Sequence, residues 1–367
     1  MFVKSISATN FRNFRNLEFC FKEQERHIII KSPNGTGKTN FLELLYYFTY
    51  LKSFRAVSDG KLINKGENYF SILINYDNDE DNEISVKYLN KSKEVVYNNK
   101  KIKRYSEIFG KYCSVVFSSD DMLIIKGNPN YKRKFFDMFF SIIDIEYFYS
   151  IKNYNCVLKQ KNALLKNKSF DKKLLEIYNY QLAQYINIIQ QKRDEFIKIT
   201  SKDFNDKYLE IGDYNYSAKI IYYPSIKIKE FTQENIFNFL MECCKKEVEL
   251  GFSFYGVHKD NYQFLLNNLN FNSYASFGQT RLASLIMKTI QADNYKKYNN
   301  ISPILLLDDV ILELDNYRKV KFVSKIFDYK QFFITISDDT LLKIFEKSSY
   351  LSFLEIIDGK IQKSNFN

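Results

Sequence analysis

The sequence predicts an α/β protein with a second, helical lobe. Strand-like patterns fill the first hundred residues, long helical patterns begin at about Asp120, and the region from residue 300 onward again alternates between strands and helices. A chain of 367 residues has room for about two lobes. We expect residues 1–119 and 300–367 to form one lobe and residues 120–299 to form the helical lobe.

The composition is that of an ordinary globular protein. Apolar residues make up 45% and charged residues 26%, which excludes a disordered chain, a collagen and a disulfide scaffold. The formal net charge of +11 is compatible with a polyanionic partner. Because His27 and His258 are the only histidines, a histidine-rich metal site is excluded.

The cysteines and the apolar pattern bear on the cellular compartment. The five cysteines form no C-x-x-C pair and are odd in number, so free thiols in a reducing compartment are the simplest interpretation. The segment from Met1 to Asn10 lacks the apolar core of a signal peptide, and no apolar stretch reaches about 18 residues. We therefore expect a cytoplasmic protein without a transmembrane helix.

The first hundred residues alternate in the manner of β-strands, and one helix interrupts them. The helix is expected at Asn40–Tyr50, directly after a turn-rich loop. The pair Asn98-Asn99 is typical of a tight turn. The expected strands cover Phe2–Ala8, Leu17–Phe21, Ile28–Ile30, Tyr69–Tyr76, Glu83–Leu89 and Glu94–Tyr97.

The middle of the chain carries an apolar pattern at near-heptad spacing. Two interpretations remain open: a short antiparallel helical arm, or an amphipathic helix packed on a core. The pattern consists of Leu175, Tyr178, Leu182, Tyr185, Ile189 and Phe196, with Tyr154, Leu158 and Leu165 upstream.

The tail returns to short strands and a helix. We expect buried strands at Ile304–Leu307 and Phe332–Ser337, with a helix between them that Val320, Val323 and Phe327 mark. Leu351–Ile357, followed by Asp358-Gly359, is typical of a closing hairpin.

The loop from Ser32 to Thr39 is the strongest local signal. Gly35 and Gly37 can take the unusual backbone conformations that point N–H groups at phosphates, and a helix N-terminus follows. In a G-x-x-x-x-G-K-T loop, Lys38 would meet the β- and γ-phosphates and the Thr39 hydroxyl would bind Mg²⁺. Ser32 replaces the first glycine, which could weaken nucleotide binding, and a chance glycine-rich turn is the alternative. The residues expected to bind the nucleotide here are Ser32, Pro33, Asn34, Gly35, Thr36, Gly37, Lys38, Thr39 and Asn40.

Two acids follow the apolar run at 305–307. A strand that ends in an acid fits a Walker B role, so we expect Asp308 to be a Mg²⁺ ligand together with Thr39. Asp309 points to the other side of the strand end and could polarise water as a general base. We therefore expect Asp309 and Lys38 to be catalytic. The alternative is a loop of solvated acids.

The segment Ser276–Arg281 precedes an apolar helix at 282–290. Taken alone, the pattern S-x-G-Q favours a plain helix N-cap at Ser276. Its position shortly before the Asp308 strand favours a second interpretation. In that interpretation it resembles an ABC-type signature, in which Ser276, Gly278 and Gln279 close on the γ-phosphate bound by a second subunit.

Three basic clusters are candidates for contact with a polyanion, because binding to a phosphate backbone needs only a positive surface. For each cluster the alternative is a solvated charged face. His258 is interpreted as a turn histidine whose hydrogen bonds are satisfied, and not as a catalytic residue. The clusters are Lys100–Arg104, Tyr131–Lys134 and Lys159–Lys161.

Taken together, these motifs resemble the RecF family of bacterial recombination-mediator ATPases, which is related to the heads of SMC proteins. The resemblance runs nearly end to end. Val257 and Lys259 depart from the family's Gly-Pro-His-Arg-Asp, and Lys161 stands where the family usually has Arg. The matching segments are Asn10–Phe14, Asn34–Asn40, Val116–Asp121, Arg133–Asp137, Leu158–Leu165, Gly256–Asp260, Ser276–Arg281 and Leu305–Asp315.

The resemblance implies an ABC-type ATPase head, with a mixed sheet, a P-loop and an antiparallel β part, plus a helical second lobe with a short antiparallel helical arm. It implies ATP and Mg²⁺ as cofactors and a homodimer when ATP is bound. Ser276, Gly278 and Gln279 would complete the nucleotide site of the other subunit, and Asp315 would lie at that interface. It also implies binding to gapped or single-stranded–double-stranded DNA, with RecR and RecA as partners.

Three functions remain open. The first is a weak, DNA-stimulated ATPase that works as a dimerisation switch in replication and recombinational repair. The second is a nucleotide-gated DNA clamp with little or no hydrolysis, which Ser32 favours, as does Asp309, because its side chain is shorter than the Glu common in related ATPases. The third is a small-molecule kinase, which would use the P-loop but not the segment Ser276–Arg281.

Overall fold

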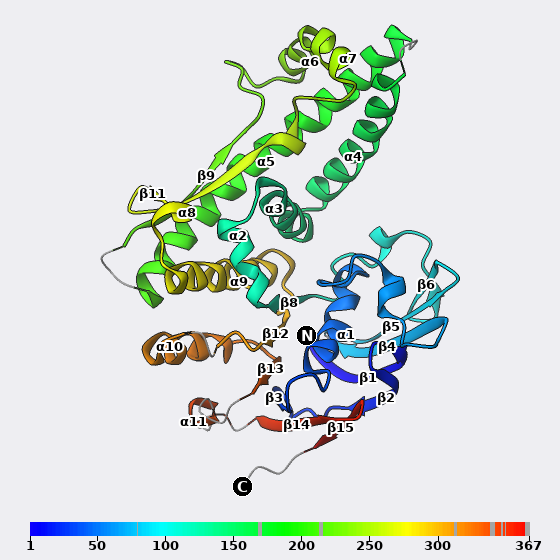
Figure 1. The fold of residues 1–367 in the computed structure, drawn as a ribbon, viewed down its shortest axis with the longest axis vertical. Helices are drawn as coiled ribbons and strands as arrows, with labels where there is room; N and C mark the ends of the chain where they lie inside the picture. Colours follow the sequence, from blue (N-terminus) through cyan, green and yellow to red (C-terminus); the bar gives the residue numbers. More distant parts are fainter. Residues whose placement is uncertain are drawn as a thin grey trace. The chain divides into compact units, whose positions relative to one another are not determined.

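The structure is a computed structural model, and it describes residues 1–78, 80–167, 171–212, 216–311, 314–337, 342–345, 348 and 350–363. The chain forms two compact units (Figure 1). Unit 1 comprises Met1–Asp121 and Gln291–Asn367, and unit 2 comprises Met122–Ile290. Helix α9 (Phe277–Asn299) begins in unit 2 and ends in unit 1.

Unit 1 contains an antiparallel sheet with the strand order β2-β1-β4-β5-β6-β7. Along β4, Phe70, Ile72 and Ile74 are buried and alternate with less buried residues, because one face of the sheet covers the core. Asn98 and Asn99 have positive φ angles of 46° and 63° and turn β6 into β7, as predicted. The strands are β1 (Phe2–Phe11), β2 (Phe14–Cys20), β4 (Tyr69–Asp77), β5 (Asp81–Leu89), β6 (Ser92–Tyr97) and β7 (Lys100–Lys101).

The second sheet of unit 1 has the order β15-β14-β3-β13-β12-β8 and is parallel apart from β15. Its central strands carry buried apolar runs because both faces of the sheet are covered. The strands predicted at 28–30, 304–307 and 332–337 are therefore found, although β13 ends at Ile336. The elements are β3 (His27–Lys31), β8 (Ser114–Phe117), β12 (Ile304–Asp308), β13 (Phe332–Ile336), β14 (Leu351–Ile357), β15 (Lys360–Lys363), α1 (Lys38–Tyr50), α10 (Asn316–Ile326) and α11 (Leu342–Phe345).

Aromatic rings hold α1 between the two sheets of unit 1. The Phe41 ring on α1 lies 6.5 Å from the Phe14 ring of β2 and 6.0 Å from the Phe333 ring of β13, measured between centroids. All three residues are buried, and edge-to-face pairs of this kind stabilise a core beyond the area that they bury. The N-terminus of α1, where the P-loop ends, is therefore fixed by packing from both sides.

Unit 2 consists mainly of helices, and α4 and α5 lie side by side as an antiparallel pair (Figure 1). Leu175, Leu182, Ile189 and Phe196 are buried along α5, so the predicted apolar stripe is confirmed. Beyond the pair with α4, α5 also packs against α6 and β9. The elements are α2 (Met122–Lys126), α3 (Pro129–Ile143), α4 (Ile145–Leu165), α5 (Lys172–Ile211), β9 (Ala218–Tyr223), α6 (Gln233–Glu242), α7 (Cys244–Leu250), β10 (Asn261–Leu266), β11 (Leu269–Asn270) and α8 (Phe271–Tyr274).

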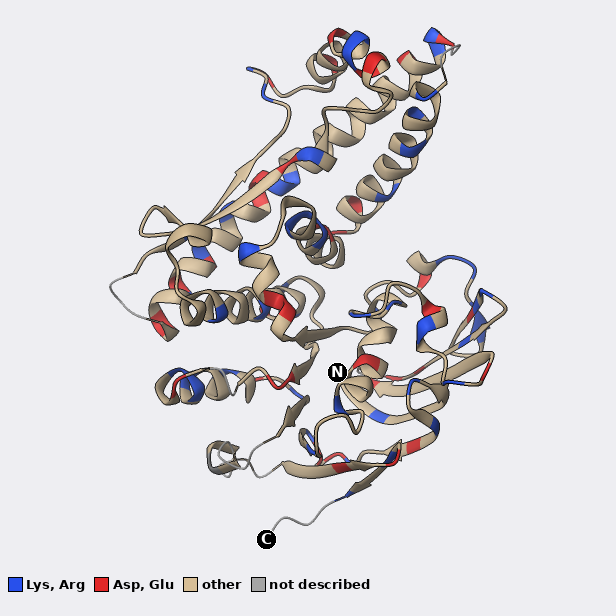
Figure 2. Cartoon of the chain, in the orientation of Figure 1, with Lys and Arg blue, Asp and Glu red and all other residues tan. Residues whose placement is uncertain are grey.

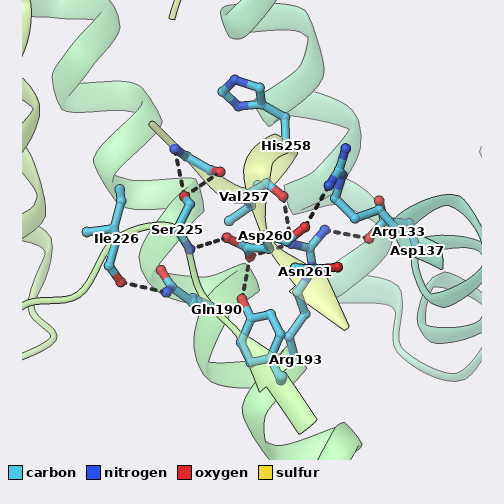
Figure 3. Close-up of polar contacts among 12 residues, drawn as sticks. Arg133, Asp137, Gln190, Arg193, Ser225, Ile226, Val257, His258, Asp260 and Asn261 are labelled. Atoms are coloured by element: carbon cyan, nitrogen blue, oxygen red, sulfur yellow. Dashed lines mark hydrogen bonds and ion pairs between the residues drawn. The ribbon is translucent and has the colours of Figure 1, made fainter. Parts of the chain in front are cut away.

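A buried ionic network joins α3, α5 and the start of β10 in unit 2 (Figure 3). The Arg193 guanidinium is fully buried and donates from Nη1 to Asp260 Oδ2 at 2.6 Å and from Nη2 to Asp137 Oδ1 at 2.7 Å. Ser225 N donates to the other oxygen of Asp260 at 2.8 Å. Each charged group in this network has partners, which is the condition for burying ions without a large penalty.

Two further expectations concern the whole chain. Every cysteine is a free thiol, as predicted. Among the helices of the described residues, none has both the length and the apolar character that crossing a bilayer requires.

Candidate nucleotide-binding site

The loop between β3 and α1 has the backbone of a phosphate-binding loop. Gly35 and Gly37 have positive φ angles of 87° and 110°, a region that residues with a side chain rarely adopt. Gly37 is the N-cap of α1, and a Cβ at this position would lie 2.4 Å from Asn13 Nδ2. Glycine is therefore required at position 37 for both its φ angle and its missing side chain, whereas Gly35 is required for its φ angle alone.

Ser32 fits the start of this loop without the conformational freedom of glycine. Its φ angle is not positive, and its side chain is buried. The hydroxyl donates to Lys31 O at 2.7 Å and accepts from Ile356 N at 2.6 Å. The departure from the glycine pattern therefore adds a link between the P-loop and β14.

Lys38 lies across the loop that it ends. The residue is 5% exposed, and its Nζ donates to Ser32 O at 2.6 Å and to Asn34 Oδ1 at 3.3 Å. Both acceptors are neutral, so neither cancels the positive charge of the ammonium group. The loop therefore offers a cation and a helix N-terminus to an anion.

Thr39 and Asp308 are in contact although 269 positions separate them. Thr39 Oγ1 donates to Asp308 Oδ1 at 2.9 Å, and Thr335 Oγ1 donates to the same oxygen at 3.2 Å. Burial has the largest influence and raises the pKa of the Asp308 carboxyl, and the nearby charge of Asp309 also raises it. The hydrogen bonds from the two threonine hydroxyls lower the pKa, but they do not cancel the increase. The structure thus brings together the hydroxyl and the acid that the sequence predicts to share a metal ion.

Asp309 follows directly and has an unusual conformation. Its φ angle is 52°, in the left-handed region, and its backbone N–H donates to Thr335 Oγ1 at 2.9 Å. Its Oδ1 is buried and has no hydrogen-bond partner in the described part of the chain. Because an unpartnered buried carboxylate oxygen is costly, this atom is suited to accept a hydrogen bond from water or to bind a cation.

A second buried carboxylate, Glu43, lies behind the loop on α1. It accepts from Arg12 Nε at 2.8 Å and from Arg55 Nη2 at 3.0 Å, and it also accepts from the Ser53 hydroxyl. Burial, the largest influence, raises the pKa of Glu43, but the hydrogen bonds and charges of these three partners outweigh it and hold the pKa below its usual value. Glu43 is therefore an ionised anchor for two arginines.

Asn13 and Asn40 connect this anchor to the P-loop. Arg55 Nη2 donates to Asn40 Oδ1 at 2.6 Å, Asn40 Nδ2 donates to Asn13 Oδ1 at 2.7 Å, and Asn13 Nδ2 donates to Thr36 O at 2.9 Å. This chain of hydrogen bonds fixes the backbone next to Gly37, where phosphate-binding loops need an exact shape.

Sequence reasoning gave no role to five residues that shape this site. Two of them lie within Asn10–Phe14, which was matched only as part of the family resemblance. Thr335 could have been found, because it lies near the end of a predicted strand that is beside the one that carries Asp308. Glu43 and Arg55 left no signal, since a buried ion pair has no sequence periodicity. The five residues are Arg12, Asn13, Glu43, Arg55 and Thr335.

The Ser276 end of α9 is in unit 2, and Ser276 caps the helix. Its Oγ accepts from Gln279 N at 3.2 Å, and Gln279 Oε1 accepts from Ser276 N at 2.9 Å. This is a capping box, so the N-cap interpretation is confirmed. Gly278 lies in the first turn, and no atom would lie within 4 Å of a Cβ there. Tyr274 and Phe277 on either side are 66% and 62% exposed.

Two other residues named from the sequence have clear local partners. Asp315 is the N-cap of α10 and accepts from Arg318 N at 3.0 Å. Tyr154 OH donates to His258 Nδ1 at 2.5 Å, and His258 Nε2 donates to Ser253 O at 3.2 Å. Burial is the main cause that lowers the pKa of His258 to about 4, so the ring is neutral at pH 7. The interpretation of His258 as a satisfied turn histidine is confirmed.

The basic clusters at 131–134 and 159–161 are not basic surfaces as the sequence suggested. Lys132 is 6% exposed and Arg133 is half-buried, and both donate to backbone carbonyls of unit 2. Lys161 is fully buried, with its Nζ 2.6 Å from Glu247 Oε2. These cations stabilise the interior, which leaves only Lys134 and Lys159 of these clusters on the surface.

The third cluster, Lys100–Arg104, does lie on the surface. Its lysines and arginine are all exposed, and one of them, Lys101, pairs with Glu94 at 2.8 Å. Figure 2 shows that lysines and arginines also occur on elements of both units. This cluster on the antiparallel sheet remains a candidate for contact with a polyanion.

Comparison with known proteins gives consistent matches over the whole chain. The family described as RecF/RecN/SMC N terminal domain matches residues 2–355. The DNA replication and repair protein RecF of Clostridium botulinum (strain Alaska E43 / Type E3) is 35% identical over 334 residues, which cover 89% of this chain and 91% of the relative. The protein of the same name from Clostridium novyi (strain NT) is 31% identical over 367 residues, covering 99% of this chain and 100% of the relative.

Solved structures agree with this result. A structure of the recombination mediator protein RecF-ATP in the RecFOR pathway has a TM-score of 0.89 at 29% identity and covers 99% of each chain. A Smc head domain bound to the C-terminal domain of ScpA, derived from Pyrococcus furiosus, has a TM-score of 0.54 at 16% identity, covering 100% of this chain and 96% of that one, and shows the fold alone. The predicted fold class, an ABC-type ATPase head plus a helical lobe, is confirmed.

The hydrogen bond between Ser32 and β14 can be tested by removing the hydroxyl. We expect Ser32→Ala to lower the free energy of unfolding by about 1–2 kcal/mol, because Ile356 N would lose its buried acceptor. Urea unfolding measures this change. The control Ser92→Ala, at an exposed strand end, should change stability by less than about 0.5 kcal/mol. Equal stability of both variants would contradict the assignment.

Because Glu43 is ionised in the folded protein, we expect its contribution to the free energy of unfolding to depend on pH. Its folded pKa lies below the usual 4.5, so the carboxylate contributes stability above that pH and loses it as the pH falls through the folded pKa. We expect Glu43→Gln to cost about 2 kcal/mol at neutral pH. The difference from the unaltered chain, measured by chemical denaturation, should shrink as the pH falls below about 4.5 and through the lowered pKa of Glu43. A difference that stays constant with pH would show that Glu43 is not an ionised anchor. The exposed control Glu195→Gln should change stability by less than about 0.5 kcal/mol at neutral pH.

Proposed function

Because the chain belongs to the RecF/RecN/SMC N-terminal domain family, and within it to the RecF proteins of DNA replication and repair, we propose that it is an ATP-dependent DNA-binding protein of recombinational repair. In this proposal ATP drives two copies together on gapped or single-stranded–double-stranded DNA, and slow, DNA-stimulated hydrolysis releases them. The protein then helps a RecR-like mediator to load RecA.

One observation carries the proposal: the hydrogen bond of 2.9 Å between Thr39 Oγ1 and Asp308 Oδ1 at the end of the P-loop. A triphosphate needs a loop of backbone N–H groups, a cation and a place for its metal ion. Gly35 and Gly37 give the loop its shape, Lys38 supplies the cation, and the Thr39–Asp308 pair supplies the metal-binding place. A RecF chain solved with ATP aligns with 99% of this chain, which supports the same nucleotide here.

The residues at this place fit Mg²⁺. Mg²⁺ prefers oxygen ligands and keeps several of its waters, and a threonine hydroxyl with one carboxylate is a common protein contribution in P-loop proteins. The unpartnered Oδ1 of Asp309 supports this proposal, because it could accept a hydrogen bond from a water bound to the ion. Thr39 and Asp308 would hold Mg²⁺, which would neutralise charge on the β- and γ-phosphates when bound.

Asp309 is the proposed general base. Its free Oδ1 can accept a hydrogen bond from a water and orient it for attack on the γ-phosphorus. The left-handed φ of Asp309, which the bond from its N–H to Thr335 Oγ1 supports, directs the residue away from the ordinary path of a strand. Lys38 would stabilise the negative charge on the phosphate oxygens.

The second half of each nucleotide site is proposed to come from the other copy. Gly278 costs an isolated helix about 1 kcal/mol relative to alanine, and nothing within 4 Å of its Cβ position requires a glycine. A phosphate that approaches the N-terminus of α9 would explain it, because a Cβ would hinder close approach. Ser276 and Gln279 would contact the same phosphate, since the Ser276 oxygen only accepts in the capping box and can still donate. Asp315 is expected at the same interface.

The proposed contact with DNA uses the exposed residues of Lys100–Arg104. A net charge of +11 favours association with a polyanion and predicts a steep dependence on salt. The partnership with a RecR-like mediator and RecA follows from the likeness to a recombination mediator of the RecFOR pathway.

A second candidate is a nucleotide-gated DNA clamp with little or no hydrolysis. The shorter side chain of Asp309 and its left-handed backbone favour this candidate, because both restrict where a water could be held. A small-molecule kinase has no comparable support, since the family match from 2 to 355 includes the segment Ser276–Arg281, which a kinase would not use.

The test of the proposal is the size of the protein with and without ATP, Mg²⁺ and gapped DNA. We expect a monomer that becomes a dimer only with ATP, and a Ser276→Arg variant that stays monomeric. Gly278→Ala should be as stable as the unaltered chain or more stable by up to about 1 kcal/mol, yet associate at least about tenfold more weakly. A chain that gives no ATP-dependent dimer, or a Gly278→Ala variant that dimerises normally, would refute the shared site.

The two candidate functions differ in phosphate release. If the chain is an ATPase, we expect Asp309→Asn to slow phosphate release by about 100-fold or more, while the ATP-dependent dimer persists for longer. The control Asp328→Asn, in the turn after α10, should leave the rate unchanged. Absence of phosphate release from the unaltered dimer on DNA would favour the clamp.

A further inference from the structure

Cations on α2 and α3 hold the backbone of the segment that leads to Ser276. This segment runs from Asp260 through β10, β11 and α8 to Ala275. At three points along it, a lysine or arginine donates to a backbone carbonyl oxygen. The three pairs are Arg133 Nη1 to Asp260 O at 2.6 Å, Lys132 Nζ to Tyr262 O at 3.3 Å and Lys126 Nζ to Ala275 O at 2.9 Å.

The first two pairs belong to the structural interior of unit 2. Arg133 and Asp260 lie in the buried network around Arg193, where the carbonyl and the carboxylate of Asp260 both have cationic donors (Figure 3). Lys132 is buried, and burial lowers its pKa to about 8. These two contacts fix the start of the segment and need no further role.

The Lys126 contact differs because its acceptor directly precedes Ser276. Ala275 links α8 to α9: its N–H donates to Phe271 O at 3.2 Å, and its φ and ψ angles of −77° and 136° are extended. The peptide group that joins Ala275 to Ser276 includes the Ala275 carbonyl and the Ser276 N–H. Lys126 holds the first of these and Gln279 Oε1 holds the second.

The position of Lys126 is itself fixed. It is the last residue of α2 and is half-buried. Gly127 ends the helix by donating from its N–H to Leu123 O at 2.9 Å, and a Cβ at Gly127 would lie 2.2 Å from that oxygen. A side chain at position 127 would therefore displace the end of α2, and with it Lys126.

We propose that Lys126 is a positioning residue for the Ser276–Gln279 end of α9. Its ammonium group fixes the plane of the peptide before Ser276 and so directs the Ser276 hydroxyl and the Gly278 backbone toward the triphosphate of a second copy. A hydrogen bond from a charged donor is stronger than a neutral one and suits this purpose. Lys126 acts through Ala275 and touches no phosphate. The inference rests on the proposed function, because it concerns the half-site that the second copy would use.

The experiment compares Lys126→Met, Lys126→Arg and the control Lys134→Met, which removes an exposed charge from α3. Three quantities are measured on the full chain: hydrogen exchange of the Ser276 and Gln279 amides without nucleotide, affinity for a fluorescent ATP analogue at low protein concentration, and the dissociation constant of the dimer with ATP and Mg²⁺. We expect Lys126→Met to speed exchange at both amides and to weaken the dimer about tenfold, with unchanged nucleotide affinity. Lys126→Arg should restore both properties, and Lys134→Met should change neither.

The outcomes separate this inference from the proposed function. If exchange at Ser276 and Gln279 is unchanged in Lys126→Met, the positioning role is refuted whether or not the chain dimerises. If exchange rises but the dimer is as tight as before, Lys126 does not prepare the half-site and the inference is also refuted. If the unaltered chain forms no dimer with ATP, the proposed function fails, while faster exchange in Lys126→Met would still support the local positioning of the loop.

Discussion

The architecture of the nucleotide site depends on the parallel pairing of β3, β13 and β12. Parallel strands end at the same edge of a sheet, so the loop after β3, Thr335 on β13 and the acids at the end of β12 must lie together there. The hydrogen bonds from Thr39 and Thr335 to one oxygen of Asp308 are the direct result. The other residues on the P-loop side of the nucleotide site, including Lys38 and the strained Asp309, are arranged around the same edge of the sheet.

Unit 2 uses charge for a different purpose. Arg193, Lys161 and Lys132 are buried and satisfy carboxylates or carbonyls that the helical lobe could not otherwise enclose. The net charge of +11 is therefore a poor measure of the positive surface available to DNA, since some of the lysines and arginines are buried inside the fold. Lys126 binds the carbonyl of Ala275 in the same way. The cations that stabilise the interior of unit 2 thus belong to the same series of contacts as the one next to Ser276.

Much of the fold and part of the site could be predicted from the sequence. Strands such as Ile304–Asp308 were clear because a strand covered on both faces is a continuous apolar run, and the P-loop was clear because Gly35 and Gly37 have φ angles that few other residues tolerate. The burial of Lys161 could not be predicted, because it depends on an ion pair with Glu247 from a helix far away in the sequence. The contact of Asn13 with Gly37 was hidden for the same reason, since nothing local at either position announces it.

Ser32 has a consequence for how such chains are found. Its backbone lies in a region open to any residue, and its hydroxyl ties the loop to the neighbouring strand. The leading glycine of the motif is thus dispensable in this architecture, whereas the glycine before the lysine is not. A search pattern that insists on the former would pass over chains like this one, while a pattern anchored on Gly37, Lys38 and Thr39 would retain them.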